Sequence, residues 1–494
     1  MVDISKHEKA QGALLASAIG DALGWPYEFN SGNQSRCNNQ DDRFVSWKRK
    51  NRIPFWHVET IEKGNYSDDT QLMLAVARSL LSEDWIKMFT SIEYPFWLEY
   101  ERGAGRAVKR AASLWKKGVV PWKCREYRKD YFMAGGNGGA MRILPHVIRN
   151  LDNDIGVIID DVIADVIISH GHPRAILGAT CYSYALYYLF NKQEVLSFAE
   201  LVDTLIDGRK IWGAAPNRDR FFEWLEVAQN ESGYNYSVEW NNCYTNMIKG
   251  LEYVKQAMND GLLSDDKKVL ENIGAYSKVC GAGDIAVLTA VYFFSKYVNT
   301  PELVISVPAF SVGIDTDTIA SMTGGLIGAF CGIDWIPLEW KSIQDYSYIC
   351  SVANDLCEDK HANTEKKREI TDFLADDIKQ IREVDSVNIE SKYSILKITE
   401  YRTAFGQTIY IKSVNRRTED NSVSKSIDKE GLIKISIKEI ENILKDEDLS
   451  RITLRKALDI VLLKYQGEDE EKIVKKVKVD KKIVSKVLVA FEQK

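Results

Sequence analysis

Residues 311–332, SVGIDTDTIASMTGGLIGAFCG, place the strongest constraint on how this chain can fold. The second part of the stretch is rich in Gly and Ala, which predicts a slim helix that other segments must cover on several sides. Asp315, Asp317 and Thr318 crowd the start of that helix. One such oxygen is an ordinary helix cap, but neighbouring carboxylates repel one another unless a cation lies between them. The stretch therefore predicts a central helix with a cation site at its N-terminus.

A second acidic motif, YSDDTQ at residues 66–71, precedes the apolar helical pattern LMLAVARSLL. Ser67, Asp68 and Asp69 again bring a hydroxyl and two carboxylates to a helix start. Together the two motifs offer four carboxylates and two hydroxyls, with no His or Cys beside them. Such all-oxygen donors suit Mg²⁺ or Mn²⁺ better than zinc, and their number suffices for two cations. We therefore expect the two motifs to meet in the fold.

A glycine loop, YFMAGGNGGAMR, leads into another apolar stretch. Around Asn137, Gly138 and Gly139 the backbone amides can approach a phosphate at a helix entrance, although glycines also serve tight packing. The loop has neither a Walker sequence nor a GxGxxG pattern. Tyr131 and Phe132 beside it can stack on a base, although aromatics are more often part of a core. The loop therefore indicates phosphate binding without fixing the ligand.

Two further segments bring polar groups next to apolar helices. Residues 12–29 predict a buried helix to about Ile19, followed by a tight loop that delivers Glu28, which is either solvated or directed at a site. The polar residues 30–63 look like a long excursion or lid. His170, in the sequence SHGHP, lies at a junction between two helices, where packing or a ligand hydrogen bond is the expected role.

Composition limits the classes of protein that this chain can belong to. Its 494 residues, 45% of them hydrophobic, suffice for one large domain with an appendage or for two to three ordinary domains. A net charge of −6 gives no general attraction to nucleic acid or to anionic membranes. The N-terminus is charged where a signal peptide is apolar, and no apolar run is long enough to span a bilayer. We therefore expect a cytoplasmic protein that does not bind membranes.

The C-terminal part predicts a separate small module. A charged helix is expected over 365–383, and we place the domain boundary between 384 and 385. Beyond it the pattern predicts a β-hairpin that turns near 405–406, a strand running into a helix over 432–445, and short final helices resembling a helix-turn-helix. Residues 385–494 carry 23 Lys and Arg against 19 Asp and Glu. So small an excess is typical of a solvated face, so nucleic-acid binding is not expected, although it stays an alternative to partner recognition.

Five motifs, in the order GDALGWPYE, YSDDTQ, GNGGAMR, SHGHP and GIDTDTIASMTGGLIGA, resemble those of the ADP-ribosylglycohydrolases. The resemblance covers residues from about Gln11 to Asp345. It implies an all-α orthogonal helical bundle, which we place at 1–384, and the small α+β module expected at 385–494 lies outside the resemblance. It also implies a binuclear Mg²⁺ or Mn²⁺ centre that hydrolyses the bond between C1″ of ADP-ribose and an acceptor. The implied partner is an ADP-ribosylated protein, first of all on arginine, or another ADP-ribosyl conjugate.

By motif position, the resemblance assigns roles to individual residues. Glu28 matches an acidic residue of the substrate-gating loop, and His170 matches a histidine close to the substrate. Gly138 and Gly139 match the loop that holds the diphosphate and ribose. The residues matching the metal set are Ser67, Asp68, Asp69, Asp315, Asp317 and Thr318.

Two questions stay open at the level of the sequence. The general base is either Asp69 or Asp317, with Glu28 assisting. The family also usually has a second glycine where Ile314 stands, and a β-branched residue disfavours positive φ, so the turn before Asp315 is expected to differ in geometry. An alternative function is a non-catalytic module that binds ADP-ribose or a nucleotide while the C-terminal part docks a partner.

Overall fold

The computed structural model describes residues 4–28, 43–259, 264–358, 381–391, 393–404, 406–416 and 469–492, with 456, 460 and 463. Contacts divide the chain into two compact units. The first unit is Met1–Lys367 with Ile381–Arg417, and the second is Arg368–Gln380 with Thr418–Lys494. The boundary suggested after residue 384 falls inside a strand, and that strand belongs to the first unit.

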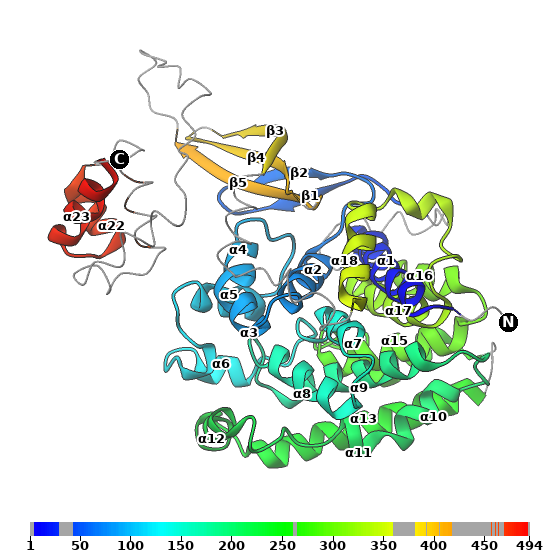
Figure 1. Ribbon diagram of the computed structural model, residues 1–494. Coiled ribbons are helices and arrows are strands. Elements are labelled where there is room, and N and C mark those ends of the chain that lie inside the picture. The colour runs from blue at the N-terminus through cyan, green and yellow to red at the C-terminus, as the bar shows by residue number, and fades with distance from the viewer. Residues whose placement is uncertain are drawn as a thin grey trace. The chain divides into compact units, whose positions relative to one another are not determined.

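The first unit is mainly helical, as the sequence predicts (Figure 1). Its α-helices are α1 (Lys6–Gly24), α2 (Asp68–Leu80), α3 (Trp85–Met88), α4 (Tyr94–Trp97), α5 (Arg106–Trp115), α6 (Arg128–Phe132), α7 (Leu144–Arg149), α8 (Ile155–Val166), α9 (Pro173–Asn191), α10 (Glu200–Asp207), α11 (Arg209–Trp212), α12 (Phe222–Glu231), α13 (Tyr236–Asn259), α14 (Asp266–Ile273), α15 (Gly283–Tyr297), α16 (Pro301–Ala309), α17 (Thr316–Cys331) and α18 (Tyr346–Cys357). Short 3₁₀ turns occupy Trp25–Tyr27, Pro121–Lys123, Ala140–Arg142 and Leu338–Ser342, and one π turn occupies Phe89–Glu93. The strands are β1 (Trp47–Asn51), β2 (His57–Ile61), β3 (Arg382–Glu390), β4 (Ser394–Arg402) and β5 (Thr408–Arg416).

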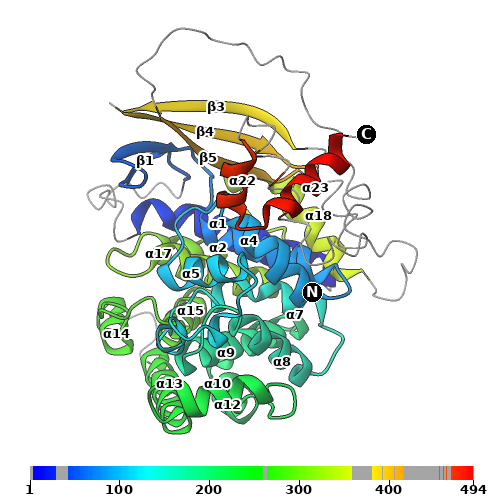
Figure 2. The same ribbon diagram turned by 90° about the vertical axis from the view of Figure 1, so that its left-hand side faces the viewer.

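The helices α1 and α17 are buried along most of their length, and they lie side by side in both views (Figures 1 and 2). Small residues let the two backbones touch. A Cβ added at Gly20 would lie 2.1 Å from the backbone oxygen of Ala320, and one at Gly324 would lie 2.0 Å from that of Ala16. Since side chains cannot fit there, the Gly- and Ala-rich composition is a requirement of the contact.

The same contact explains why α1 is longer than the sequence predicts. The expected helix ended near Ile19, because glycine weakens a helix interior. In the structure α1 continues through Gly20 and Asp21 to Gly24. The packing of Gly20 against α17 outweighs its low intrinsic helix propensity, and the continued helix delivers the side chain of Asp21 into the interior.

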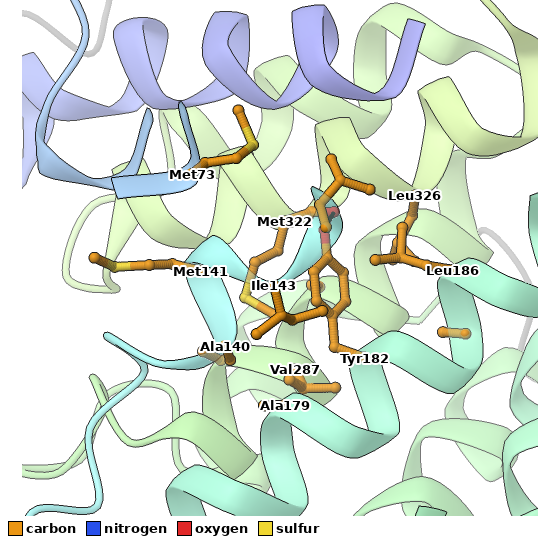
Figure 3. Packing of buried hydrophobic residues seen from close by; sticks show 14 of the residues in the cluster. Met73, Ala140, Met141, Ile143, Ala179, Tyr182, Leu186, Val287, Met322 and Leu326 are labelled. Atoms are coloured by element: carbon orange, nitrogen blue, oxygen red, sulfur yellow. Dashed lines mark hydrogen bonds between the residues drawn. The ribbon is translucent and has the colours of Figure 1, made fainter. Parts of the chain in front are cut away.

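A layer of larger side chains packs beneath α17 (Figure 3). Tyr182 of α9 is fully buried and donates its hydroxyl hydrogen to the backbone oxygen of Met322 at 2.9 Å. Val287 of α15, Leu186 of α9 and Leu326 of α17 surround it in Figure 3. The helices α9 and α15 therefore cover α17 on the side away from α1.

The polar segment 30–63 is partly regular. Residues 29–42 lie outside the described part of the chain, so the lid interpretation is not tested there. Further along, β1 and β2 form an antiparallel hairpin in which Trp47 pairs with Ile61. The side chains of Trp47 and Ile61 are buried together with Trp25. The helical unit therefore also contains a β-hairpin, which the polar composition of this segment did not predict.

A three-stranded antiparallel sheet in the order β3-β4-β5 also belongs to the first unit. The predicted hairpin is confirmed as β4 and β5, with its turn at residues 403–407. The charged segment and junction before it were not predicted as a strand, yet residues 382–390 form β3. Of the helix expected over 365–383, residues 365–380 lie outside the described residues, and 382–383 belong to β3. The strand and helix expected over 432–445 also lie outside the described residues.

In the second unit the described residues form α22 (Glu470–Val477) and α23 (Lys481–Glu492), joined by a short bend. Ile473, Val477, Val484 and Val487 are buried within this pair. The two helices confirm the expected final helices and their bend near residue 479. Among the helices that the structure describes in either unit, none has the length and hydrophobicity needed to cross a membrane.

Candidate active site

A cavity of about 800 Å³ opens where the starts of α2 and α17 meet the glycine loop. Its walls combine segments that are far apart in the sequence. Among the residues singled out from the sequence, those that line it are Glu28, Asp68, Asp69, Asn137, Gly138, His170, Asp315, Asp317 and Thr318. The expected meeting of the two acidic motifs therefore occurs.

The first half of the site is the start of α2, where Ser67 is the N-cap residue. Asp21 of α1 accepts hydrogen bonds from the backbone amides of Ser67 and Thr70, both at 3.0 Å, and from the Thr70 hydroxyl at 2.6 Å. Asp21 thus satisfies amides that a cap would normally serve. This leaves the carboxylates of Asp68 and Asp69 directed at the cavity rather than at their own helix.

The second half is the start of α17, where Asp315 is the N-cap residue but makes no capping hydrogen bond through its side chain. Its Oδ2 instead accepts a hydrogen bond from Nδ2 of Asn137 at 2.9 Å. The backbone amide of Thr318 donates to Oδ1 of Asp317 at 2.9 Å. The hydroxyl of Thr318 donates to Oδ1 of Asp69 at 3.1 Å, which joins the two halves directly.

The turn before Asp315 is built without strain at Ile314. Gly313 takes the positive φ, at 94°. Ile314 is not among the described non-glycine residues with positive φ, which are Ala199, Asp345 and Lys478. The Ile314 side chain is fully buried, so it contributes to the core beneath the turn. A β-branched residue is therefore compatible with this position.

The electrostatics of the site are dominated by buried negative charge. Burial raises the pKa of Asp69, and the charge of Asp21 raises it further. Burial also raises the pKa of Asp317, with added repulsion from Glu28. No basic side chain is hydrogen-bonded to these carboxylates in the described part of the chain. The arrangement thus holds carboxylates together with little internal relief of their repulsion.

The residues fit a hard divalent cation. Asp21, Asp69 and Asp317 each bring one carboxylate oxygen within 4.8 Å of the others. The oxygens of Asp21 already receive its three donors, so this residue is better suited to holding α2 than to binding an ion. The remaining donors are carboxylate and hydroxyl oxygens, which Mg²⁺ and Mn²⁺ prefer.

Glu28 lies at the wall of the cavity, directly after the 3₁₀ turn that follows α1. Burial and the charge of Asp315 raise the pKa of Glu28 to about 7, against an opposing effect of Arg49. A carboxyl group with such a pKa can exchange a proton near neutral pH. The position therefore suits an acid or base at the mouth of the site.

The glycine loop is fixed by backbone contacts. The amide of Asn137 donates to the backbone oxygen of Gly281 at 2.9 Å. Arg142 donates from Nη1 to the oxygen of Gly138 at 3.0 Å, and its Nε donates to Asp165 at 2.6 Å. A Cβ at Gly138 would lie 2.5 Å from the Val108 side chain, so only glycine fits beside the cavity.

His170 is buried at the inner wall beside Gly138. Its Nδ1 shares a hydrogen bond of 2.8 Å with the Ser169 hydroxyl. Burial, and then the charge of Arg142, lower the pKa of His170 to about 3. The ring is therefore neutral at physiological pH and suits hydrogen bonding to a ligand rather than proton transfer.

Four of the residues expected at the site lie behind it. Ser67 donates its hydroxyl hydrogen to Asp69 at 3.2 Å without lining the cavity, and Gly139 packs against Val166. Tyr131 and Phe132 are fully buried and do not reach the cavity. The Tyr131 hydroxyl donates to the backbone oxygen of Ile167 at 2.6 Å. The expectation that these two rings flank a base is therefore not supported, because both belong to the core.

Sequence reasoning missed Asp21, Arg106 and Arg110. The two arginines line the outer wall of the cavity, one turn apart on α5. Their spacing after a glycine break was a usable signal. The signal for Asp21 was an acidic residue within an otherwise apolar helical pattern, which only a buried partner can satisfy.

Known proteins of one family resemble this chain over much of its length. The profile of the family described as ADP-ribosylglycohydrolase matches residues 3–366. ADP-ribosylhydrolase ARH3 of Danio rerio is 24% identical over 361 residues, covering 67% of this chain and 85% of that protein. ADP-ribosyl-[dinitrogen reductase] glycohydrolase of Rhodospirillum rubrum is 26% identical over 215 residues, covering 42% of this chain and 62% of that protein.

Among solved structures, an ADP-ribosylglycohydrolase-related protein complex aligns with a TM-score of 0.45 at 17% identity, covering 71% of this chain and 98% of that chain. The family match spans both acidic motifs, the glycine loop and His170. The chain therefore belongs to the ADP-ribosylglycohydrolase family, whose members are hydrolases.

Proposed function

We propose that this protein is a metal-dependent ADP-ribosyl hydrolase that cleaves the C1″ glycosidic bond between ADP-ribose and its acceptor. The observation that carries the proposal is the convergence of two acidic helix starts on one cavity, joined by the hydrogen bond from Thr318 to Asp69. Because buried carboxylates repel an anionic ligand, the cluster supports a cation between them and the substrate.

On this proposal, two Mg²⁺ or Mn²⁺ ions would be held by Asp68, Asp69, Asp315, Asp317 and Thr318, which line the cavity, and by the hydroxyl of Ser67, which in the structure donates to Asp69 behind the cavity wall. Bound there, the cations would act as Lewis acids toward the ribose hydroxyls and the attacking water. Asn137 restrains Asp315 through their hydrogen bond, so the carboxylate keeps one orientation. Asp21 restrains the start of α2 by accepting hydrogen bonds from the backbone amides of Ser67 and Thr70.

The protein's own groups handle the substrate and the proton. Asp69 or Asp317 accepts the proton of the water that attacks C1″, and Glu28 can exchange a proton at the mouth of the cavity. The backbone at Gly138 and the neutral ring of His170 supply hydrogen bonds to the ribose and diphosphate. Because Tyr131 and Phe132 are buried, the adenine would lie elsewhere on the outer wall.

The substrate proposed first is a protein ADP-ribosylated on arginine. The name of the Rhodospirillum rubrum relative refers to an ADP-ribosylated protein, dinitrogen reductase, which supports a protein substrate. The cavity volume of about 800 Å³ offers room for ADP-ribose with part of its acceptor. The proposed location of the reaction is the cytoplasm.

The test is release of ADP-ribose from a defined arginine-linked peptide, with Mg²⁺ or Mn²⁺ and with EDTA. We expect EDTA to stop turnover, and Asp315→Ala to abolish it while the helical circular dichroism signal stays unchanged. Asp154→Ala is the matched control, because this aspartate caps α8 on the surface and should leave turnover intact. Turnover that persists in EDTA would contradict the metal dependence. Tight ADP-ribose binding without any release would instead support the binding-module alternative.

A further inference from the structure

The side chain of Arg102 is buried among residues of β5, β2 and the 3₁₀ turn at Trp25. Its guanidinium carbon lies 3.9 Å from the centroid of the Tyr410 ring of β5 and 5.6 Å from that of Trp25. Glu59 of β2 is 3.8 Å away, and Lys412 of β5 donates a hydrogen bond to Glu59 at 2.7 Å. Arg102 is almost fully buried, and within the described residues its Nε and Nη1 have no hydrogen-bond partner. The aromatic faces and the charge of Glu59 therefore offset part of its lost hydration, while burial still lowers the pKa of Arg102.

The backbone of the same residue contacts the active site. The oxygen of Arg102 accepts a hydrogen bond from the Asp68 amide at 3.0 Å, and its amide donates to Gln71 at 3.1 Å. Gly103, next in sequence, has a φ of 118°, and a Cβ there would lie 2.9 Å from Oδ1 of Asp68. The turn at 102–103 thus sets where the start of α2 and the Asp68 side chain can lie.

The sheet also holds the other end of α2. Gln407, in the turn between β4 and β5, is almost fully buried and accepts a hydrogen bond from Nη1 of Arg78 at 2.6 Å. Arg78 lies in the last turn of α2 and makes two hydrogen bonds of 2.7 Å to Glu93. The turn therefore inserts into the helical unit and satisfies a buried charge on the metal-site helix.

We infer that the sheet β3-β5 is a positioning element of the active site, in which Tyr410 and Lys412 hold Arg102, and Arg102 holds Asp68. The sheet lies beyond residues 3–366, which the family profile matches. The inference rests on the proposed function, since it takes Asp68 as a metal ligand. Tyr410 is a positioning residue, because it acts through Arg102 and is not among the residues that line the cavity.

Tyr410→Leu tests this inference in the full-length chain. The substitution removes the aromatic face from Arg102, so the 102–103 turn can shift and Asp68 loses its fixed position. Mn²⁺ binding is measured by calorimetry, and the Mn²⁺ concentration that gives half-maximal turnover is measured alongside it. We expect the Kd for Mn²⁺ to rise roughly 10-fold or more, as is typical when an outer partner of a ligand is lost. Tyr410→Phe keeps the ring over Arg102 and should restore the affinity.

A control separates positioning from general destabilisation. Leu396 is fully buried in β4, so Leu396→Ala weakens the sheet without touching Arg102, and it should lower the melting temperature while leaving the Kd for Mn²⁺ unchanged. An unchanged Kd for Mn²⁺ in Tyr410→Leu, or an equal rise of that Kd in Leu396→Ala, would overturn this inference and leave the proposed function standing. A wild-type protein that binds no Mn²⁺ would overturn the proposed function and this inference together.

Discussion

The two halves of the active site are held in different ways. The α17 half rests on direct contact between two helix backbones, in which Gly20 and Ala320 leave no space for a side chain. The α2 half is held by hydrogen bonds: the Asp21 carboxylate accepts from its first amides, and the backbone oxygen of Arg102 accepts from the amide of Asp68. One half is thus fixed by the shape of the backbone, and the other by hydrogen bonds and charge.

This difference teaches where the site can vary. A contact between backbones has no adjustable part, so any added atom must move a whole helix. A polar network can be weakened one group at a time, because each donor or acceptor contributes separately. We therefore expect changes at the α17 half to affect folding, and changes at the α2 half to affect the site before they affect the fold.

Gly20→Ala should have the largest effect on stability. In an exposed helix this substitution stabilises by roughly 0.5–1 kcal/mol, but here the new Cβ would meet the Ala320 oxygen at 2.1 Å. We expect a loss of about 3 kcal/mol or more in the free energy of unfolding, measured by urea titration. Gly105→Ala is the control, because a Cβ there meets no atom within 4 Å. Equal stability of the two variants would contradict the backbone contact.

Asp21→Asn should have an intermediate effect. The amide cannot accept from all three donors that Asp21 now serves, so a buried donor at Ser67 or Thr70 loses its partner. A hydrogen bond to a charged group contributes roughly 1.5–3 kcal/mol, and we expect a loss of this size together with weaker Mn²⁺ binding. Asp154→Asn should leave stability unchanged, because Asn caps an exposed helix as well as Asp does. If Mn²⁺ binding by Asp21→Asn equals that of the wild type, Asp21 does not position the α2 half.

Thr318→Val should have the smallest effect, and it addresses the bond that joins the two halves. Valine keeps the shape of threonine but cannot donate to Asp69. The free energy of unfolding should fall by about 1 kcal/mol, while Thr318→Ser, which retains a hydroxyl, should fall less. Chemical denaturation of both variants measures this difference. A Val variant as stable as the Ser variant would show that the two halves hold their positions independently.

Local sequence signals predicted much of the fold. The acidic starts of α2 and α17 were recognised because a hydroxyl or carboxylate directly before an apolar helical pattern has a local cause. The hairpin of β4 and β5 was recognised from alternation around a glycine turn. The helices α22 and α23 were recognised from their apolar spacing.

Features that depend on distant partners were not predictable in this way. Asp21 acts on amides 46 and 49 residues further along the chain, so its apolar neighbours indicate a buried partner but not which segment supplies it. An aromatic pair next to a glycine loop reads the same whether it faces a ligand or the core, and Tyr131 and Phe132 face the core. The strand β3 is almost entirely exposed, so it lacks the apolar alternation by which strands are recognised.

The contact between α1 and α17 also bears on the order in which the protein can be completed during synthesis. Thr316 donates a hydrogen bond to the backbone oxygen of Gly24 across 292 residues. A ribosome adding about 5–20 residues per second needs roughly 15–60 s to make that span. Throughout that time the glycine face of α1 has no α17 to cover it. The newborn chain therefore exposes its first helix until late in translation, which makes α1 the segment on which we expect a chaperone to act.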